Sequence, residues 1–189
     1  LLVLIPTALL AGIVKGTTGF GFALVLVPIL VVLLENPAHA VAIVLPLALC
    51  QDVFILLTTR GRLRFSIVSP MVLAGLVGIP IGTLVLVILP EDALRLVISL
   101  AILMAAFVVF RGFTIHTEHD RVARAVAAFV SGILLVSTGI PGPAFSVFLV
   151  SLRIHRDDFR PTFSSLFASL EVFTLASLTF SGVVTRDTL

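Results

Sequence analysis

Long apolar stretches separated by short polar segments dominate the pattern of this chain. Spanning β-strands would be shorter and would alternate apolar with polar residues, whereas these stretches are continuously apolar. A helix needs about 20 apolar residues to cross a hydrocarbon layer roughly 30 Å thick. We therefore predict an all-α, polytopic membrane protein whose transmembrane helices are Ala40–Thr58, Ile67–Leu89, Ala93–Phe110 and Pro161–Phe180.

Two further apolar stretches are interrupted near their middles. Leu1–Leu34 contains Lys-Gly-Thr-Thr-Gly-Phe-Gly at 15–21, and Val122–Leu152 contains Ser-Thr-Gly-Ile-Pro-Gly-Pro at 137–143. Glycine and proline at this density break a helix. Each arm has about 10–14 residues, which is too short to cross a bilayer alone at a rise of about 1.5 Å per residue. The stretches are either kinked helices or re-entrant hairpins.

The distribution of arginine favours hairpins. Cytoplasmic loops are enriched in Lys and Arg. With the Arg-rich segments on that side, both ends of Val122–Leu152 lie in the cytoplasm, so this stretch enters the membrane and returns. A matching hairpin at Leu1–Leu34 enters from the opposite face. The Arg-rich segments are 60–64, 111–124 and 153–160, whereas Glu35–His39 and Pro90–Asp92 contain neither Lys nor Arg.

This arrangement predicts two inverted repeats, each opening with a glycine-broken re-entrant or discontinuous helix. Residues 1–110 form the first repeat, a hairpin plus three transmembrane helices, and 121–189 form an incomplete second repeat, a hairpin plus one helix. Counterparts of Ile67–Phe110 would fall near positions 187–230, so we expect about two further helices beyond the last residue. A shift of 120 residues pairs Gly12 with Gly132, Thr18 with Thr138, Gly19 with Gly139 and Gln51 with Glu171.

Composition agrees with this architecture and narrows the classes of function. Hydrophobic residues make up 59% of the chain and charged residues 12%, and the mean hydropathy is +1.27. A soluble domain could not hide so much apolar surface. The net charge of +2 is spread over short loops, which argues against nucleic-acid binding. Metal-ligand residue types gather at 116–120, but in a charged loop, so we expect neither metal nor cofactor.

Two glycine signatures resemble those of the TauE/SafE sulfite-exporter family. The first is Gly12-x-x-Lys15-Gly16-x-x-Gly19-Phe20-Gly21-Phe22 followed by Pro28, and the second is Gly132-x(6)-Gly139-x-x-Gly142-Pro143. Val136 and Ala144 depart from the second signature, where the family favours glycine and proline. The resemblance implies a multi-pass protein of the bacterial-type cytoplasmic (inner) membrane. It also implies transport of a small sulfur-containing or carboxylated anion.

The interrupted helices point to an anion site independently of the resemblance. A helix that starts within the membrane has unpaired N–H groups and a positive dipole end, and transporters use such termini at the bilayer midplane. Glycine allows an oxyanion to approach the backbone, and neighbouring hydroxyls can donate to it. The alternative is that the glycines only permit close helix packing, as we expect for Gly75, Gly78 and Gly82. The predicted substrate-binding residues are Lys15, Gly16, Thr17, Thr18, Gly19, Gly21, Ser137, Thr138, Gly139 and Gly142.

Three charged residues lie deep in the predicted spans, namely Lys15, Asp52 and Glu171. Each costs about 2.5–3.5 kcal/mol or more at a helix centre. Lys15 either holds the anion or serves as counter-ion for Asp52 or Glu171. Glu171 either carries a coupling proton or is a static hydrogen-bond partner for a hairpin. Asp52 suits a structural or solvated role, and Gln51 a polar contact to the substrate or a hairpin.

We therefore predict a transporter that moves a small organic or sulfur-containing anion of the sulfite, sulfonate or carboxylate class. The repeats would rock to expose the anion to each side in turn, with a proton or cation as the coupling ion. An intramembrane enzyme is the weaker alternative, because the spans contain neither a nucleophile–base pair nor an HExxH-like metal pair. A non-transporting membrane scaffold is another alternative, but it would leave Lys15 and the glycine breaks without a shared purpose.

Overall fold

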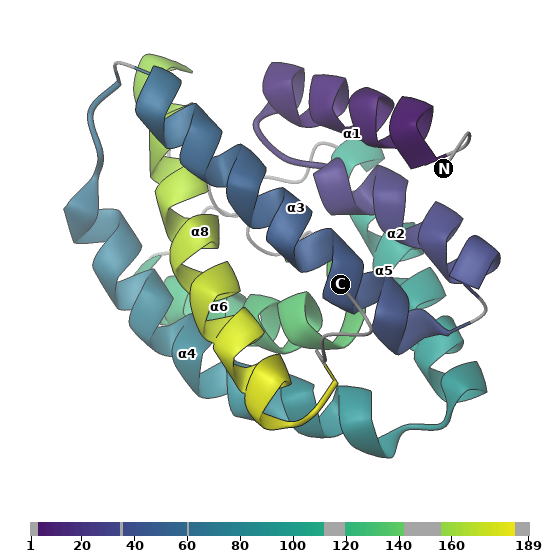
Figure 1. Ribbon diagram of the computed structural model, residues 1–189. Coiled ribbons are helices and arrows are strands. Elements are labelled where there is room, and N and C mark those ends of the chain that lie inside the picture. Colours follow the sequence, from purple (N-terminus) through teal and green to yellow (C-terminus); the bar gives the residue numbers. More distant parts are fainter. Residues whose placement is uncertain (1–3, 35, 60, 112–119, 142–155, 184–189) are drawn as a thin grey trace.

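The computed structural model describes residues 4–34, 36–59, 61–111, 120–141 and 156–183, and all regular structure within these ranges is helical (Figure 1). This confirms the predicted all-α class. The helices in the described ranges are α1 (Leu4–Thr18), α2 (Phe22–Leu34), α3 (Pro37–Thr58), α4 (Phe65–Ile88), α5 (Glu91–Arg111), α6 (Asp120–Thr138) and α8 (Arg156–Phe180).

Three of the described helices are long and apolar enough to cross a membrane, namely α3, α4 and α8. They coincide with three of the predicted spans, and α5 occupies the position of the fourth. The helices begin two to five residues before the predicted boundaries, because polar residues start them. Asn36 caps α3: its Oδ1 accepts hydrogen bonds from the N–H groups of Ala38 at 3.0 Å and His39 at 3.2 Å. Acidic residues likewise occupy the first turns of α5 and α8.

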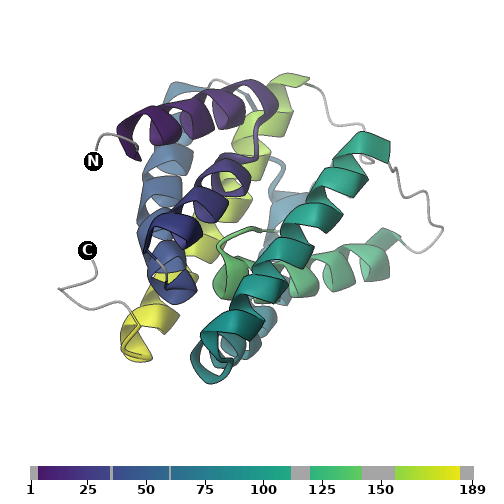
Figure 2. The same cartoon turned by 90° about the vertical axis from the view of Figure 1, so that its right-hand side faces the viewer.

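The first interrupted stretch folds as a helical hairpin. α1 and α2 lie against each other and run in opposite directions, joined by a turn at Gly19–Gly21 (Figures 1 and 2). Gly19 and Gly21 have φ angles of 85° and 97°, in the left-handed region that favours glycine. The Gly19 N–H donates to Lys15 O at 2.7 Å and closes the last turn of α1. The predicted break is therefore correctly placed.

The second interrupted stretch begins in the same way. α6 ends at Thr138, and Gly139 follows with a φ of 70° and an N–H bond to Leu135 O at 2.9 Å. The rest of the predicted second hairpin, including 142–152, lies outside the described residues. Whether the two repeats are inverted in the membrane stays a prediction.

A seam of glycines brings α4 into backbone contact with α6. A Cβ added at Gly78 would collide with the carbonyl oxygen of Phe129, and one added at Gly132 would collide with the backbone of Gly75. α4 also packs against α8, and α3 runs along α8 on the other side of that helix (Figure 1). The packing role expected for Gly75, Gly78 and Gly82 is confirmed.

The polar segments group at two ends of the bundle. At one end, Asn36 Nδ2 donates to Glu91 Oε1 at 3.2 Å and joins the start of α3 to the start of α5. At the other, the Arg62 N–H donates to Asp158 Oδ1 at 2.9 Å, and Arg64 Nη2 lies 3.2 Å from Asp158 Oδ2. Segments that the topology prediction assigns to one side of the membrane thus lie together.

Candidate functional site

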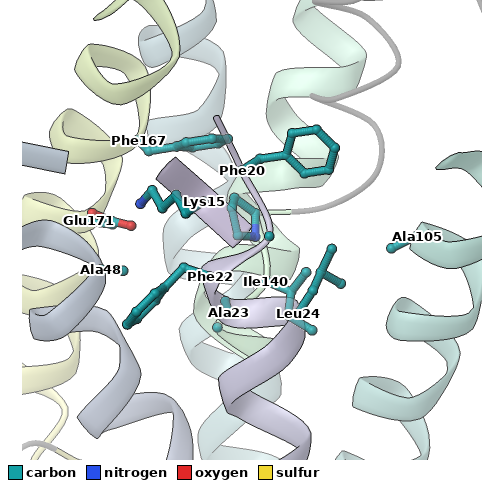
Figure 3. A pocket seen from close by; sticks show the side chains of 13 residues that line it. Lys15, Phe20, Phe22, Ala23, Leu24, Ala48, Ala105, Ile140, Phe167 and Glu171 are labelled. Carbon is teal, nitrogen blue, oxygen red and sulfur yellow. The ribbon is translucent and has the colours of Figure 1, made fainter. Parts of the chain in front are cut away.

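A pocket lies where the two helix breaks meet the middle of the bundle (Figure 3). Its cavity volume is about 30 Å³, and it is partly open. Backbone from both breaks forms part of its wall, at Gly21–Leu24 and at Gly139–Pro141. The remaining lining residues project from α1, α3, α5, α8 and the hairpin turn, and are Lys15, Ala48, Ala105, Phe167, Glu171 and Phe20.

The first turn of α2 presents its backbone to this pocket. The first hydrogen bond within the helix runs from Val25 N–H to Gly21 O at 3.2 Å, so the N–H groups of Phe22, Ala23 and Leu24 have no partner inside the helix. The positive end of the helix dipole lies at the same place. Unpaired donors and this dipole together favour a negatively charged ligand.

Lys15 reaches the pocket from the last turn of α1 and forms a buried ion pair. Its Nζ lies 2.8 Å from Asp52 Oδ2, and the side chains are 4% and 0% exposed, respectively. The ammonium group also lies 5.9 Å from the centre of the Phe22 ring. Of the two roles left open by the sequence, the structure shows Lys15 as counter-ion for Asp52, while its side chain still lines the pocket.

Glu171 brings a second carboxyl group to the same site. It is 2% exposed, lines the pocket from α8 and is an electrostatic neighbour of both Asp52 and Lys15. Figure 3 shows its carboxyl group and the Lys15 amine pointing toward each other. Within the described ranges, Glu171 Oε2 and both carboxyl oxygens of Asp52 lack a well-aligned hydrogen bond. Among the described residues, the site therefore holds two neighbouring carboxyl groups and one amine, and the amine is paired with Asp52.

Only some of the predicted site residues reach this pocket. Lys15, Gly21, Gly139 and Glu171 line it. Gly16 and Thr17 are exposed at the end of α1, and Gly19 packs toward Phe159. Thr18 ends α1 without a described side chain, and Gly142 lies outside the described residues.

The predicted hydroxyl donors are engaged by their own helices. Thr17 donates to Ile13 O and Val14 O, both at 3.0 Å. Ser137 donates to Ile133 O at 2.8 Å, and Thr138 donates to Leu134 O at 2.6 Å. Serine and threonine in a last helical turn readily bond to the carbonyl one turn earlier. Each hydroxyl has one proton, so these groups offer lone pairs rather than donors at the breaks.

Gln51 contacts the first hairpin. Its Nε2 donates to Gly12 O at 3.1 Å and joins α3 to α1. This is one of the two contacts that the sequence suggested. The bond holds α1 at Gly12, about one turn before Lys15. Its donor Gln51 lies on α3, the helix that also carries Asp52.

Sequence reasoning missed two contributions from α8. Phe163 is fully buried, and its ring centre lies 5.1 Å from that of Phe167 and 6.4 Å from that of Phe20, which stabilises the hairpin turn beside the pocket. Ser164 and Thr174 are buried with hydroxyls that have no hydrogen-bond partner in the described part of the chain. A signal existed: the mean hydropathy of α8 is 1.4, against 2.4 and 2.5 for α3 and α4, which is typical of a helix that faces protein.

Apolar helices long enough to span a membrane, interrupted helices and a pocket lined by buried charged side chains are the features of a polytopic membrane protein. The chain belongs to the sulfite exporter TauE/SafE family, whose model matches residues 4–189. The family resemblance of the two glycine signatures is thereby confirmed, and the family comprises transporters rather than enzymes. No curated protein and no solved structure matches the chain.

Proposed function

We propose that this protein binds a small anion in the pocket between the two helix breaks and moves it across the cytoplasmic membrane. One observation carries the proposal: the unpaired N–H groups of α2, the Lys15 ammonium and the glycine backbone at 139 converge on one buried space. Helix donors and a cation in a site of low polarity are complementary to an oxyanion.

The rest of the pocket wall supports an anion with a short organic part. Ala48, Ala105, Ile140 and Phe167 are apolar and leave room beside the charged groups. Sulfite, short sulfonates and small carboxylates share the required chemistry, namely a compact oxyanion with little else to desolvate.

Alternating access by two inverted repeats is the proposed mechanism. The equivalent glycines Gly19 and Gly139 both follow the last turn of a helix with left-handed backbone and donate to the carbonyl four residues earlier. The equivalent helices α3 and α8 pack against each other at the centre. Both breaks and the central helix pair line one pocket, which favours a site that can open toward either face.

Flux through proteoliposomes tests the proposed function. We expect uptake of at least one of labelled sulfite, methanesulfonate and acetate above the rate of protein-free liposomes. Lys15→Gln should lower that uptake at least tenfold, because the pocket loses its cation. Arg111→Gln, which removes one exposed positive charge at the end of α5, is the matched control and should retain uptake.

Two results would contradict the proposal. Absence of uptake for all three anions would favour the scaffold alternative. Wild-type uptake by a folded Lys15→Gln variant would separate transport from this pocket.

A further inference from the structure

We propose that each anion crosses the membrane together with one proton. The Asp52–Glu171 carboxyl pair binds this proton when Lys15 leaves Asp52 and pairs with the anion. This inference rests on the proposed function and specifies its coupling ion. Three helices supply the groups concerned: α1 carries Lys15, α3 carries Asp52 and α8 carries Glu171. All three side chains are at most 4% exposed.

Other titratable groups do not compete for this role among the described residues. α2 and α4 contain none, and those of α5 and α6 lie in terminal turns outside the pocket lining. On α3, His39 and Cys50 are exposed, and the remaining charged residues of α8 lie in its first turns. Within the described part of the chain, a proton that enters the site from the pocket therefore meets only Glu171, Lys15 and, behind them, Asp52.

The balance of charge explains why a proton is needed. One ammonium and two carboxylates would leave a buried site with a net charge of −1, which is costly in a membrane interior. One proton on Glu171 makes the resting site neutral, with Lys15 paired to Asp52. A monovalent anion that pairs with Lys15 leaves the Asp52 carboxylate without a counter-ion. A second proton on Asp52 restores neutrality, so one proton accompanies one anion.

Glu171 is placed to deliver that proton. It lines the pocket, whereas Asp52 is fully buried and does not. In the transfer, the Lys15–Asp52 ion pair is replaced by a Lys15–anion pair, and the Glu171 O–H proton moves to the Asp52 carboxylate. Glu171 is then reprotonated from the pocket, so the net uptake is one anion and one proton. Glu171 Oε2 and Asp52 Oδ1 make no well-aligned hydrogen bond in the described structure, and the Ser164 hydroxyl lies beside Asp52, so these groups are placed to take part.

Infrared difference spectroscopy tests the proton site without any substrate. We expect purified protein at neutral pH to show a buried, protonated carboxyl band that shifts slowly in D₂O. Glu171→Gln should abolish the band, because the remaining Lys15–Asp52 pair is ionised. Asp52→Asn should abolish it as well, because Lys15 then pairs with an ionised Glu171. A spectrum unchanged by both substitutions would overturn the proposal.

Coupling is tested by measuring labelled anion and internal pH together in proteoliposomes, using sulfite, methanesulfonate and acetate. We expect one proton per anion in the wild type and about tenfold anion accumulation per unit of pH gradient, the ratio that electroneutral one-to-one coupling gives. The double variant Asp52→Asn/Glu171→Gln, which leaves no carboxyl group beside Lys15 to take the proton, should move the anion without it, and comparing the two proteins cancels any proton that the anion carries itself. Asp92→Asn, an exposed carboxylate in the first turn of α5, is the matched control.

The outcomes separate this inference from the proposed function. Flux of any test anion without a proton difference between the wild type and the double variant Asp52→Asn/Glu171→Gln would overturn the coupling and leave transport intact. Absence of all anion flux would overturn both the proposed function and the coupling. The infrared result would then report only whether the carboxyl pair shares a proton.

Discussion

The two helix breaks of this protein share a backbone conformation and differ in chemistry. Gly19 and Gly139 have φ angles of 85° and 70°, and each N–H closes the preceding helix. At the first break the closing carbonyl belongs to Lys15, which forms the buried ion pair. At the second break it belongs to Leu135, a fully buried apolar side chain. With the shift of 120 residues that relates the two predicted repeats, Asp52 corresponds to Val172, so the predicted second repeat lacks both partners of the pair.

This difference separates two requirements of the site. Glycine backbone lines the pocket at both breaks, through Gly21 at the first and Gly139 at the second. Charge is needed once, because a second buried ammonium would repel the first and would need its own carboxylate. The first repeat therefore supplies the cation, whereas the second supplies backbone and the additional carboxyl group of Glu171.

Replacing the first-repeat pair by its second-repeat equivalents gives the largest expected effect. Lys15→Leu should destabilise the protein by about 3–5 kcal/mol, because the Asp52 carboxylate is left buried without its partner. Adding Asp52→Val should restore most of that stability, while anion flux stays abolished. Unfolding in detergent and flux in proteoliposomes measure the two effects. Equal instability of the single and double variants would show that the pair is not the source of the loss.

The packing glycines should respond differently from those at the breaks. Gly78→Ala should cost about 1–3 kcal/mol, since the new Cβ overlaps the Phe129 carbonyl and must separate α4 from α6. Gly16→Ala is the control: nothing lies within 4 Å of its added Cβ, and alanine favours the helix by about 0.5–1 kcal/mol. Thermal unfolding in detergent should rank Gly16→Ala above wild type and Gly78→Ala below it. The reverse order would contradict the glycine seam.

Of the three sets of variants, substitutions of the break glycines should have the smallest effect on the free energy of unfolding. Gly19→Ala and Gly139→Ala should each lose about 1–2 kcal/mol, because an L-residue is strained in left-handed backbone. Crowding adds to this, since the new Cβ would lie 3.3 Å from Phe159 Cε1 or 3.2 Å from Val27 Cγ2. Gly182→Ala isolates the backbone strain, because Gly182 has a φ of 77° in open space. A loss at Gly139 no greater than that at Gly182 would remove crowding from the explanation.

Local features of the chain were predictable from the sequence. Apolar length identified the helices, and the density of glycine located both breaks within a few residues. Gly75 and Gly78 could be told from the break glycines because they have no hydroxyl neighbour, whereas Gly82 precedes Thr83. Helix starts were placed too late, since polar capping residues such as Asn36 extend a helix beyond its apolar stretch.

The partner choices inside the site could not be predicted in the same way. Lys15 and Asp52 lie on different helices, and helices that are apolar on all sides give no indication of which face is turned inward. The hydroxyls beside the glycines were expected to face the pocket. Their bonds to the preceding turn depend on side-chain rotamers, which the sequence pattern does not encode.

The small buried share of α1 has a mechanical consequence. Ala11 and Lys15 are buried on this helix. Four of its apolar side chains are at least 54% exposed, namely Ile5, Leu9, Leu10 and Ile13. Its links to neighbouring helices include the Lys15–Asp52 pair, the Gln51–Gly12 bond and a bond from Arg160 to Thr17 O at 3.3 Å. Polar links of this kind can exchange partners one at a time, whereas an apolar interface must separate as a whole. We therefore expect α1 to move about the Gly19–Gly21 turn once the Lys15–Asp52 ion pair opens. In the proposed function, binding of the anion to Lys15 would open that pair.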